Sequence, residues 1–204
     1  MDFLGLRTLT VIQDTIDLVK ANKGVQVEFD NDMNDPKVYK LWQDGNSVGI
    51  FQFESQGMTN FMKELKPDCL EDIIAGVSLY RPGPMDQIPR YIANKKDPEH
   101  AVYTHPALKP ILKVTYGCMV YQEQVMQIVR DLAGYSLGRA DLVRRAMGKK
   151  KLDVMARERE IFINGQLDED GNIVVPGCVR NGIDAESANR IFDEMAEFAK
   201  YAFN

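Results

Sequence analysis

The chain has 204 residues, 45% hydrophobic and 27% charged, a composition typical of a soluble globular protein with a substantial core. No stretch approaches the roughly 18 consecutive apolar residues of a membrane span, and the N-terminus lacks the basic start and apolar run of a signal peptide, so we expect a cytoplasmic protein without a membrane partner. The net charge of −5 argues against a surface covered with nucleic-acid contacts.

The first third of the chain shows mainly helical spacing. Apolar residues recur three and four positions apart over 11–19, which predicts a helix with one buried face. A second helix is expected to begin at Asp35 and Pro36, with Val38, Leu41 and Trp42 facing inward. The β-branched and aromatic run 48–53 follows a turn sequence and predicts a short strand.

Two consecutive helices are predicted next. Ser55 can cap the first, and Asp68 and Glu71 have the spacing of a capping box at the start of the second. The inner face of the first helix is expected to carry Met58, Phe61, Met62 and Leu65. The segment 81–84, Arg-Pro-Gly-Pro, must end the second helix, because proline lacks an amide hydrogen and glycine permits a tight turn.

The second half of the chain is also mostly helical in pattern. A brief extended segment is expected over 114–121, and the helix that follows should stop at Gly134. Ser136 can cap a basic helix, residues 165–183 predict a small hairpin or exposed loop, and Asp184 can cap a final helix. The fold class is therefore predicted to be mainly α, a multi-helix domain with a few short β-strands or hairpins.

Cysteine and histidine give little indication of a metal site. The chain has three cysteines, far apart and without the paired spacing of zinc or redox motifs, so reduced thiols are expected. His100 and His105 lie in a polar stretch with no nearby ligand set, and surface or packing roles are expected for both.

Positive charge is concentrated in 139–151, which holds six basic residues and one acid. This segment therefore carries +5 and the remainder of the chain −10. In a helix, Arg145 and Lys149 lie one turn apart, and Arg144 and Lys151 fall on a neighbouring strip. Arginine binds phosphate oxygens bidentately and lysine adds a mobile charge, so the segment suits a triphosphate or a DNA backbone. The alternative is a solvated basic face.

Two other residues have open interpretations. Arg81, beside the rigid turn, either contacts a phosphate or pairs with a carboxylate. Asp2 precedes an apolar run, where an aspartate is ordinarily a cap or a surface residue. Because two-metal phosphoryl transfer needs several converging carboxylates and the chain has no compact Asp-x-Asp cluster, chemistry by this chain alone is not expected.

Several ordered motifs closely resemble the alpha subunit of bacterial DNA polymerase III, a C-family polymerase. The resemblance covers essentially the whole chain. The motifs are MDFLGLRTL (1–9), GIFQFES (49–55), YRPGPM (80–85), TYG (115–117), YQEQVM (121–126) and RRAMGKKK (144–151).

The resemblance implies the end of the palm over 1–10 and the fingers over 11–204, truncated at the C-terminal end. It implies a DNA-directed DNA polymerase whose fingers bind the incoming deoxynucleoside triphosphate and template-primer DNA. Asp2 matches one of three palm aspartates that hold two Mg²⁺ ions in the family. The chain ends at Asn204, straight after Tyr201 and Phe203 and without a polar tail, so we expect a fragment. Because the other two palm aspartates would lie outside it, we expect the fragment to be inactive alone.

The resemblance also implies roles for the basic residues. Arg144 and Arg145 match the fingers arginines that hold the triphosphate, and Lys149 is grouped with them as nucleotide-binding. Arg81, Lys150 and Lys151 are assigned to DNA or to the active-site cleft. Other replicase subunits would bind through regions outside this chain.

Two rival functions remain open. A non-enzymatic helical module that binds nucleic-acid phosphates would need neither triphosphate nor metal and would show steep salt dependence. A protein-binding scaffold would show no such binding. Removal of neighbouring domains would expose apolar surface, so weak self-association is a further expectation.

Overall fold

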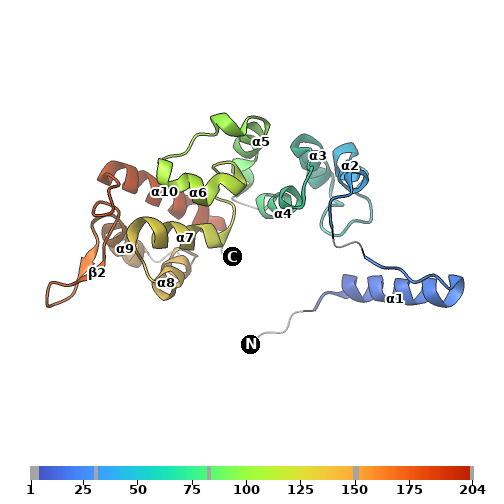
Figure 1. Cartoon of the computed structure of the whole chain (residues 1–204), viewed down its shortest axis with the longest axis horizontal. Coiled ribbons are helices and arrows are strands. Elements are labelled where there is room, and N and C mark those ends of the chain that lie inside the picture. Colours follow the sequence, from blue (N-terminus) through green and yellow to red (C-terminus); the bar gives the residue numbers. More distant parts are fainter. Residues whose placement is uncertain (1–4, 30–31, 82–83, 149–151, 203–204) are drawn as a thin grey trace. The chain divides into compact units, whose positions relative to one another are not determined.

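The computed structural model describes residues 5–29, 32–81, 84–148 and 152–202, and it is mainly helical, which confirms the predicted fold class. The chain forms two compact units, Met1–Asp72 and Ile73–Asn204, and each is described by itself. Helices run through both units, and the strands of the described residues are two short ones in the second unit (Figure 1). Among the helices described, none combines the length and apolar character that a membrane crossing requires.

The first unit is built around helices α2 (Pro36–Asp44) and α3 (Gln56–Leu65), which pack against each other. The caps are those the sequence predicts: the Asp35 carboxylate accepts a hydrogen bond from the amide of Lys37, and Ser55 Oγ accepts one from Met58. The four predicted inner residues of α3 are all buried, namely Met58, Phe61, Met62 and Leu65. The inward face predicted for α2 was partly wrong. Val38 and Leu41 are exposed, whereas Trp42 is half-buried against Phe53, and Tyr39 is the buried residue.

The predicted strand over 48–53 was wrong. The segment forms consecutive tight turns, in which Ile50 donates its amide hydrogen to Ser47 and Phe53 donates to Ile50. Gly49 and Gln52 both have positive φ, which is incompatible with an extended strand. The turns bring Phe53 to Trp42, with ring centroids 5.5 Å apart. The apolar run is thus used for packing rather than for sheet formation.

Helix α1 (Arg7–Lys23) forms where the periodicity predicts it and ends at Gly24, whose φ of 67° is left-handed. The buried face predicted for it was wrong, since none of its residues is buried. Helix α4 (Leu70–Leu79) begins at the end of the first unit, and the reach-back residue of its cap is Asp72 rather than Glu71: the Asp68 amide donates to Asp72 Oδ2 at 3.1 Å.

Short elements lie between α4 and α7 in the sequence of the second unit. They are the 3₁₀ turns η1 (Pro84–Gln87), η2 (Pro98–His100), η3 (Pro106–Leu108) and η4 (Lys113–Thr115), with helices α5 (Ile88–Lys96) and α6 (Lys109–Leu112). The extended segment predicted over 114–121 is thus partly wrong, because η4 and a left-handed turn at Tyr116 and Gly117 occupy its first half. Cys118–Val120 are buried and lead directly into α7.

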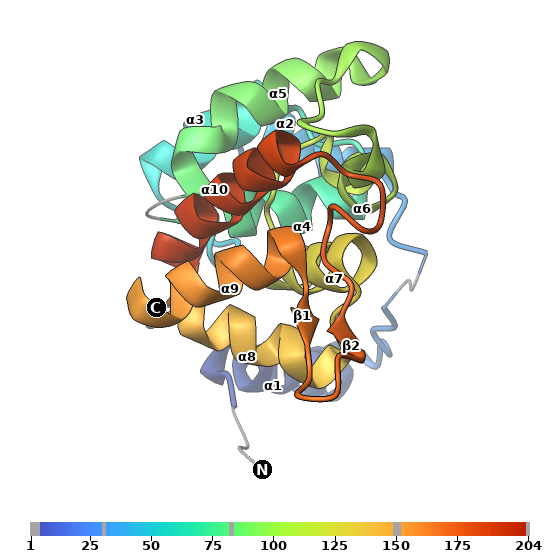
Figure 2. The same cartoon turned by 90° about the vertical axis from the view of Figure 1, so that its left-hand side faces the viewer.

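The main core lies among α7 (Gln122–Ala133), α8 (Leu137–Gly148), α9 (Leu152–Asn164) and α10 (Ala185–Ala202). Helices α8, α9 and α10 lie side by side, with α7 against α8 (Figure 2). Phe162 and Phe192 meet in this core with ring centroids 5.6 Å apart. The predicted caps are present: Ser136 Oγ accepts from the Arg139 amide, and Asp184 Oδ1 accepts from the Ser187 amide.

The predicted hairpin is also present, as the antiparallel strands β1 (Gln166–Leu167) and β2 (Ile173–Val175), with an irregular register. The chain after β2 is fixed to the helices by backbone hydrogen bonds from Gly177 to Ala133 and from Cys178 to Phe162, at 2.9 and 2.8 Å. The segment after the hairpin is therefore bonded to the C-terminal ends of α7 and α9, between which α8 lies in the sequence.

Candidate anion-binding site

Helix α8 presents two faces with different chemistry. Ala140, Val143 and Met147 are buried against the neighbouring helices. Asp141, Arg144 and Arg145 share another face, because residues three and four positions apart lie one turn from each other. The helix thus places two guanidinium groups beside one carboxylate.

Asp141 bridges the two arginines. Its Oδ1 accepts hydrogen bonds from Arg144 Nε at 2.9 Å and Arg144 Nη2 at 2.7 Å, and its Oδ2 lies 2.7 Å from Arg145 Nε. Hydrogen bonding from Arg144, reinforced by the positive charges of Arg144 and Arg145, lowers the pKa of the Asp141 carboxyl below its ordinary value. The carboxylate is therefore ionised at neutral pH, and the three side chains carry a net charge of +1.

A third contact to the cluster comes from α7. Arg144 Nη1 donates to Gln122 Oε1 at 3.0 Å, across 22 residues of sequence. Gln122 also lines a cavity of about 160 Å³ together with Arg81, Ser78 and Tyr121. The structure therefore brings the predicted site residue Arg81 to the same cavity as the glutamine that holds Arg144.

Arg139, also in the basic segment, is held by contacts within the protein. Its Nη1 donates to Gln166 Oε1 at 2.6 Å, its Nη2 lies 3.2 Å from Glu158 Oε1, and its guanidinium is 5.0 Å from the ring centre of Tyr135. The Tyr135 hydroxyl donates to Glu158 as well. Burial, together with the nearby Glu158 charge, raises the Tyr135 pKa. Arg139 thus joins α8, α9 and β1, and the charge available for a ligand is lower than the sequence count.

The chain is similar in sequence to known proteins. Residues 8–170 match the family described as the bacterial DNA polymerase III alpha subunit finger domain. The chain belongs to this family. Similar proteins include the DNA polymerase III subunit alpha of Thermus aquaticus, 49% identical over 210 residues, that of Rickettsia felis, 48% identical over 204, and that of Staphylococcus aureus, 44% identical over 204. Each match covers the whole chain but only 16% of the first two relatives and 18% of the third.

The finger-domain family membership confirms the resemblance, whereas the individual site residues stay predictions. Arg144, Arg145 and Arg81 are placed as described above. Asp2 and the lysines Lys149, Lys150 and Lys151 lie outside the described residues.

Two residues that contact the arginines of the Arg144 cluster were missed by the sequence analysis. Asp141 entered only as the one acid of the basic segment, although its spacing to Arg144 and Arg145 is that of helical ion pairs. Gln122 lies in the YQEQVM motif, and local sequence gives no indication that it reaches Arg144. Only the packing of α7 on α8 reveals this contact.

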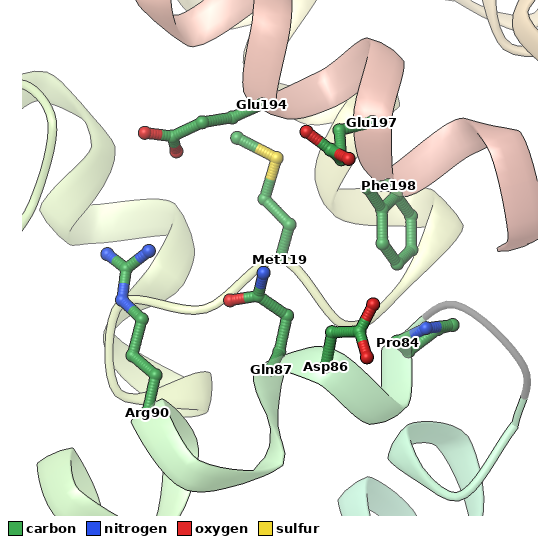
Figure 3. A pocket seen from close by; sticks show the side chains of 8 residues that line it. All are labelled: Pro84, Asp86, Gln87, Arg90, Met119, Glu194, Glu197 and Phe198. Carbon is green, nitrogen blue, oxygen red and sulfur yellow. The ribbon is translucent and has the colours of Figure 1, made fainter.

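A second cavity in the finger domain, of about 150 Å³, has the opposite character. Asp86 and Arg90 reach it from η1 and α5, and Glu194 and Glu197 reach it from α10 (Figure 3). Three carboxylates against one guanidinium make this cavity unfavourable for a polyanion. Of the two cavities, the one beside the Arg144 cluster therefore has the more favourable charge for an anion.

One group of possible metal ligands occurs within the described ranges: Asp68, Cys69 and Asp72 have ligand atoms within 4.8 Å of one another. Burial raises the pKa of the Cys69 thiol to about 11, so it is protonated at neutral pH. Magnesium requires oxygen ligands, so this thiol-containing group does not fit it. The Mg²⁺ expectation therefore depends on Asp2 and on carboxylates that the described residues do not supply.

Proposed function

We propose that this chain forms the fingers, and over residues 1–10 the adjoining edge of the palm, of a DNA-directed DNA polymerase that acts in replication. In this proposal Arg144 and Arg145 bind the triphosphate of the incoming deoxynucleotide. The supporting observation is the guanidinium pair on one face of α8, joined by the Asp141 carboxylate and close to the cavity lined by Arg81 and Gln122.

The chemistry of the pair suits a triphosphate. A guanidinium has five N–H donors, and Arg145 contacts Asp141 through Nε, so its two terminal nitrogens can donate to phosphate oxygens. The Arg145 side chain is 63% exposed, so a ligand can reach it. The Arg144 side chain is 24% exposed and is held by its contacts to Asp141 and Gln122. Charged hydrogen bonds to phosphate contribute about 1.5–3 kcal/mol each.

The other assignments complete the proposal. Lys149 extends the nucleotide site, and Arg81, Lys150 and Lys151 contact template-primer DNA or line the cleft. Asp2 is a ligand of the catalytic Mg²⁺ ions together with palm carboxylates from elsewhere in the alpha subunit. Other replicase subunits bind regions beyond this chain. The isolated chain does not catalyse nucleotide addition, because Asp2 alone cannot hold two metal ions.

The test uses the full alpha subunit that carries this sequence, with Arg144→Ala plus Arg145→Ala. Loss of one charged hydrogen bond corresponds to a decrease of about 10- to 100-fold, so removal of both arginines should lower deoxynucleotide affinity by at least this factor, measured by primer extension over a nucleotide concentration series. The control is Arg157→Ala plus Arg180→Ala, which removes two exposed arginines, and it should retain wild-type affinity. Unchanged affinity in the first variant would refute the triphosphate assignment.

The same variants separate the alternative, a helical module that binds nucleic-acid phosphates without catalysis. That function predicts binding of the chain to duplex DNA without triphosphate or metal, with affinity falling steeply as salt increases. The polymerase proposal predicts that the chain alone gives no primer extension and that the Arg144 and Arg145 variant loses nucleotide affinity at constant salt.

A further inference from the structure

We propose that Asp141 and Gln122 are positioning residues that hold Arg144 and Arg145 as one phosphate-binding unit. This inference rests on the proposed function, because it assigns a task to residues that contact the two arginines rather than the substrate. Its basis is the geometry of the cluster and the different chemistry of the two holding groups.

Asp141 joins the arginines through separate oxygens. Oδ1 takes both hydrogen bonds from Arg144, and Oδ2 pairs with Arg145 Nε. A long, exposed side chain such as Arg145 would otherwise lose considerable rotamer freedom on binding a ligand. Because one carboxylate anchors both guanidinium groups before a ligand arrives, part of this entropy loss has already occurred.

Gln122 fixes the other side of Arg144 without adding charge. Its amide oxygen accepts from Nη1 at 3.0 Å, whereas Asp141 accepts from Nε and Nη2. Two cations and one anion leave a net charge of +1 at the cluster, and a neutral amide preserves it. A carboxylate at residue 122 would keep a hydrogen-bond acceptor but cancel the remaining positive charge. A substitution at residue 122 can therefore change the charge of the cluster while it keeps the hydrogen-bond acceptor for Arg144.

Arg139 provides an internal comparison. It is also held by one carboxylate and one glutamine, Glu158 and Gln166, but Glu158 serves this single arginine and the pair is shielded, with side chains 22% and 15% exposed. In the Arg144 cluster one carboxylate serves two arginines, one of them mostly exposed. The first arrangement neutralises a partly buried charge, and the second keeps a net positive charge at the surface, on Arg145.

The test is a set of coupled substitutions in the full alpha subunit, assayed with primer-template DNA, a deoxynucleoside triphosphate and Mg²⁺. Asp141→Asn should raise the nucleotide KM about tenfold, a typical size for coupled neighbouring residues, with a smaller change in kcat. In the background of Arg144→Ala plus Arg145→Ala, the same substitution should change KM less than about twofold, because its targets are gone. Asp141→Glu should restore part of the affinity.

Gln122→Glu supplies an independent arm that retains a side chain of nearly the same size. It should raise the nucleotide KM in the wild-type background and have no further effect once both arginines are removed. The matched control is Asp131→Asn, which removes the carboxylate of the exposed Arg130–Asp131 pair in α7, 2.7 Å between Arg130 Nε and Asp131 Oδ1, and should leave KM unchanged.

The outcomes separate the two proposals. If the arginine variant itself keeps wild-type KM, the triphosphate assignment fails and the positioning roles fail with it. If the arginine variant loses affinity but Asp141→Asn and Gln122→Glu have no effect, only the positioning roles are refuted. If Asp141→Asn remains as damaging without the arginines, Asp141 acts through general structure, and the positioning role is also refuted.

Discussion

Gln124 is a buried glutamine in the first turn of α7, and Gln124→Met is expected to destabilise the chain strongly despite its similar volume. Gln124 Oε1 accepts hydrogen bonds from the amides of Val120 and Tyr121 at 2.8 and 2.9 Å. Gln124 Nε2 donates to Thr115 Oγ1 at 2.8 Å. One side chain thus joins η4, the segment before α7 and α7 itself.

The magnitude follows from these three bonds. Methionine removes the acceptor of the Val120 amide, which lies in a buried segment, at a cost of about 1–3 kcal/mol. Tyr121 is half-buried, and its amide and the Thr115 bond each add about 1 kcal/mol. Additional burial of apolar surface by methionine offsets about 1 kcal/mol. The expected loss is therefore about 2–4 kcal/mol in the free energy of unfolding.

The assay is urea unfolding of the chain, followed by far-ultraviolet circular dichroism. The control is Gln127→Met, one turn further along α7, which contributes none of these three bonds. A loss below about 1 kcal/mol for Gln124→Met, or a loss equal to that of the control, would refute the reasoning. In the full alpha subunit, the same substitution should also weaken nucleotide binding, because Gln122 lies in the same helical turn.

Three further outcomes are expected. Gly177→Ala should lower the melting temperature much more than Gly182→Ala, because both residues have φ above 79° but a Cβ at 177 would lie 2.3 Å from a backbone nitrogen, whereas one at 182 meets nothing within 4 Å. Hydrogen bonding from the Ser187 amide lowers the pKa of Asp184, so its stabilising contribution is present above the ordinary value of 3.8 and lost as pH falls through the lower folded pKa. Urea midpoints measured from about pH 5 to about pH 2 should therefore fall less for Asp184→Asn than for the wild type. Burial raises the pKa of Cys178 to about 12, so a thiol reagent at neutral pH should modify half-exposed Cys69 first, and Cys69→Ser should remove this early reaction.

Each of these outcomes has a clear contrary result. Equal melting temperatures for the two glycine variants would show that the backbone approach at residue 177 is not as close as described. If the urea midpoints of wild type and Asp184→Asn fall equally with pH, protonation of Asp184 does not contribute to the loss of stability in acid. Early modification of the chain after Cys69→Ser would show that a buried thiol is accessible.

Local sequence determined the helices and their ends. Asp35, Ser55, Ser136 and Asp184 cap helices because each cap needs only a side-chain oxygen and an amide two or three residues away. Gly134 ends α7 because glycine adopts the left-handed conformation readily. The mainly helical class and the family could be predicted for the same reason, since both depend on residue order alone.

Tertiary structure decided what each side chain does. The run 48–53 has strand-like residues, but strand formation needs a partner for its backbone groups, and Trp42 provides a packing surface instead. The basic segment has one apparent chemistry in sequence, yet Arg139 neutralises Glu158 whereas Arg144 and Arg145 share Asp141. Gln122 joins that cluster only because α7 packs on α8. The sequence therefore determines how many basic residues the segment holds. Long-range packing determines which of them are neutralised by other groups of the protein.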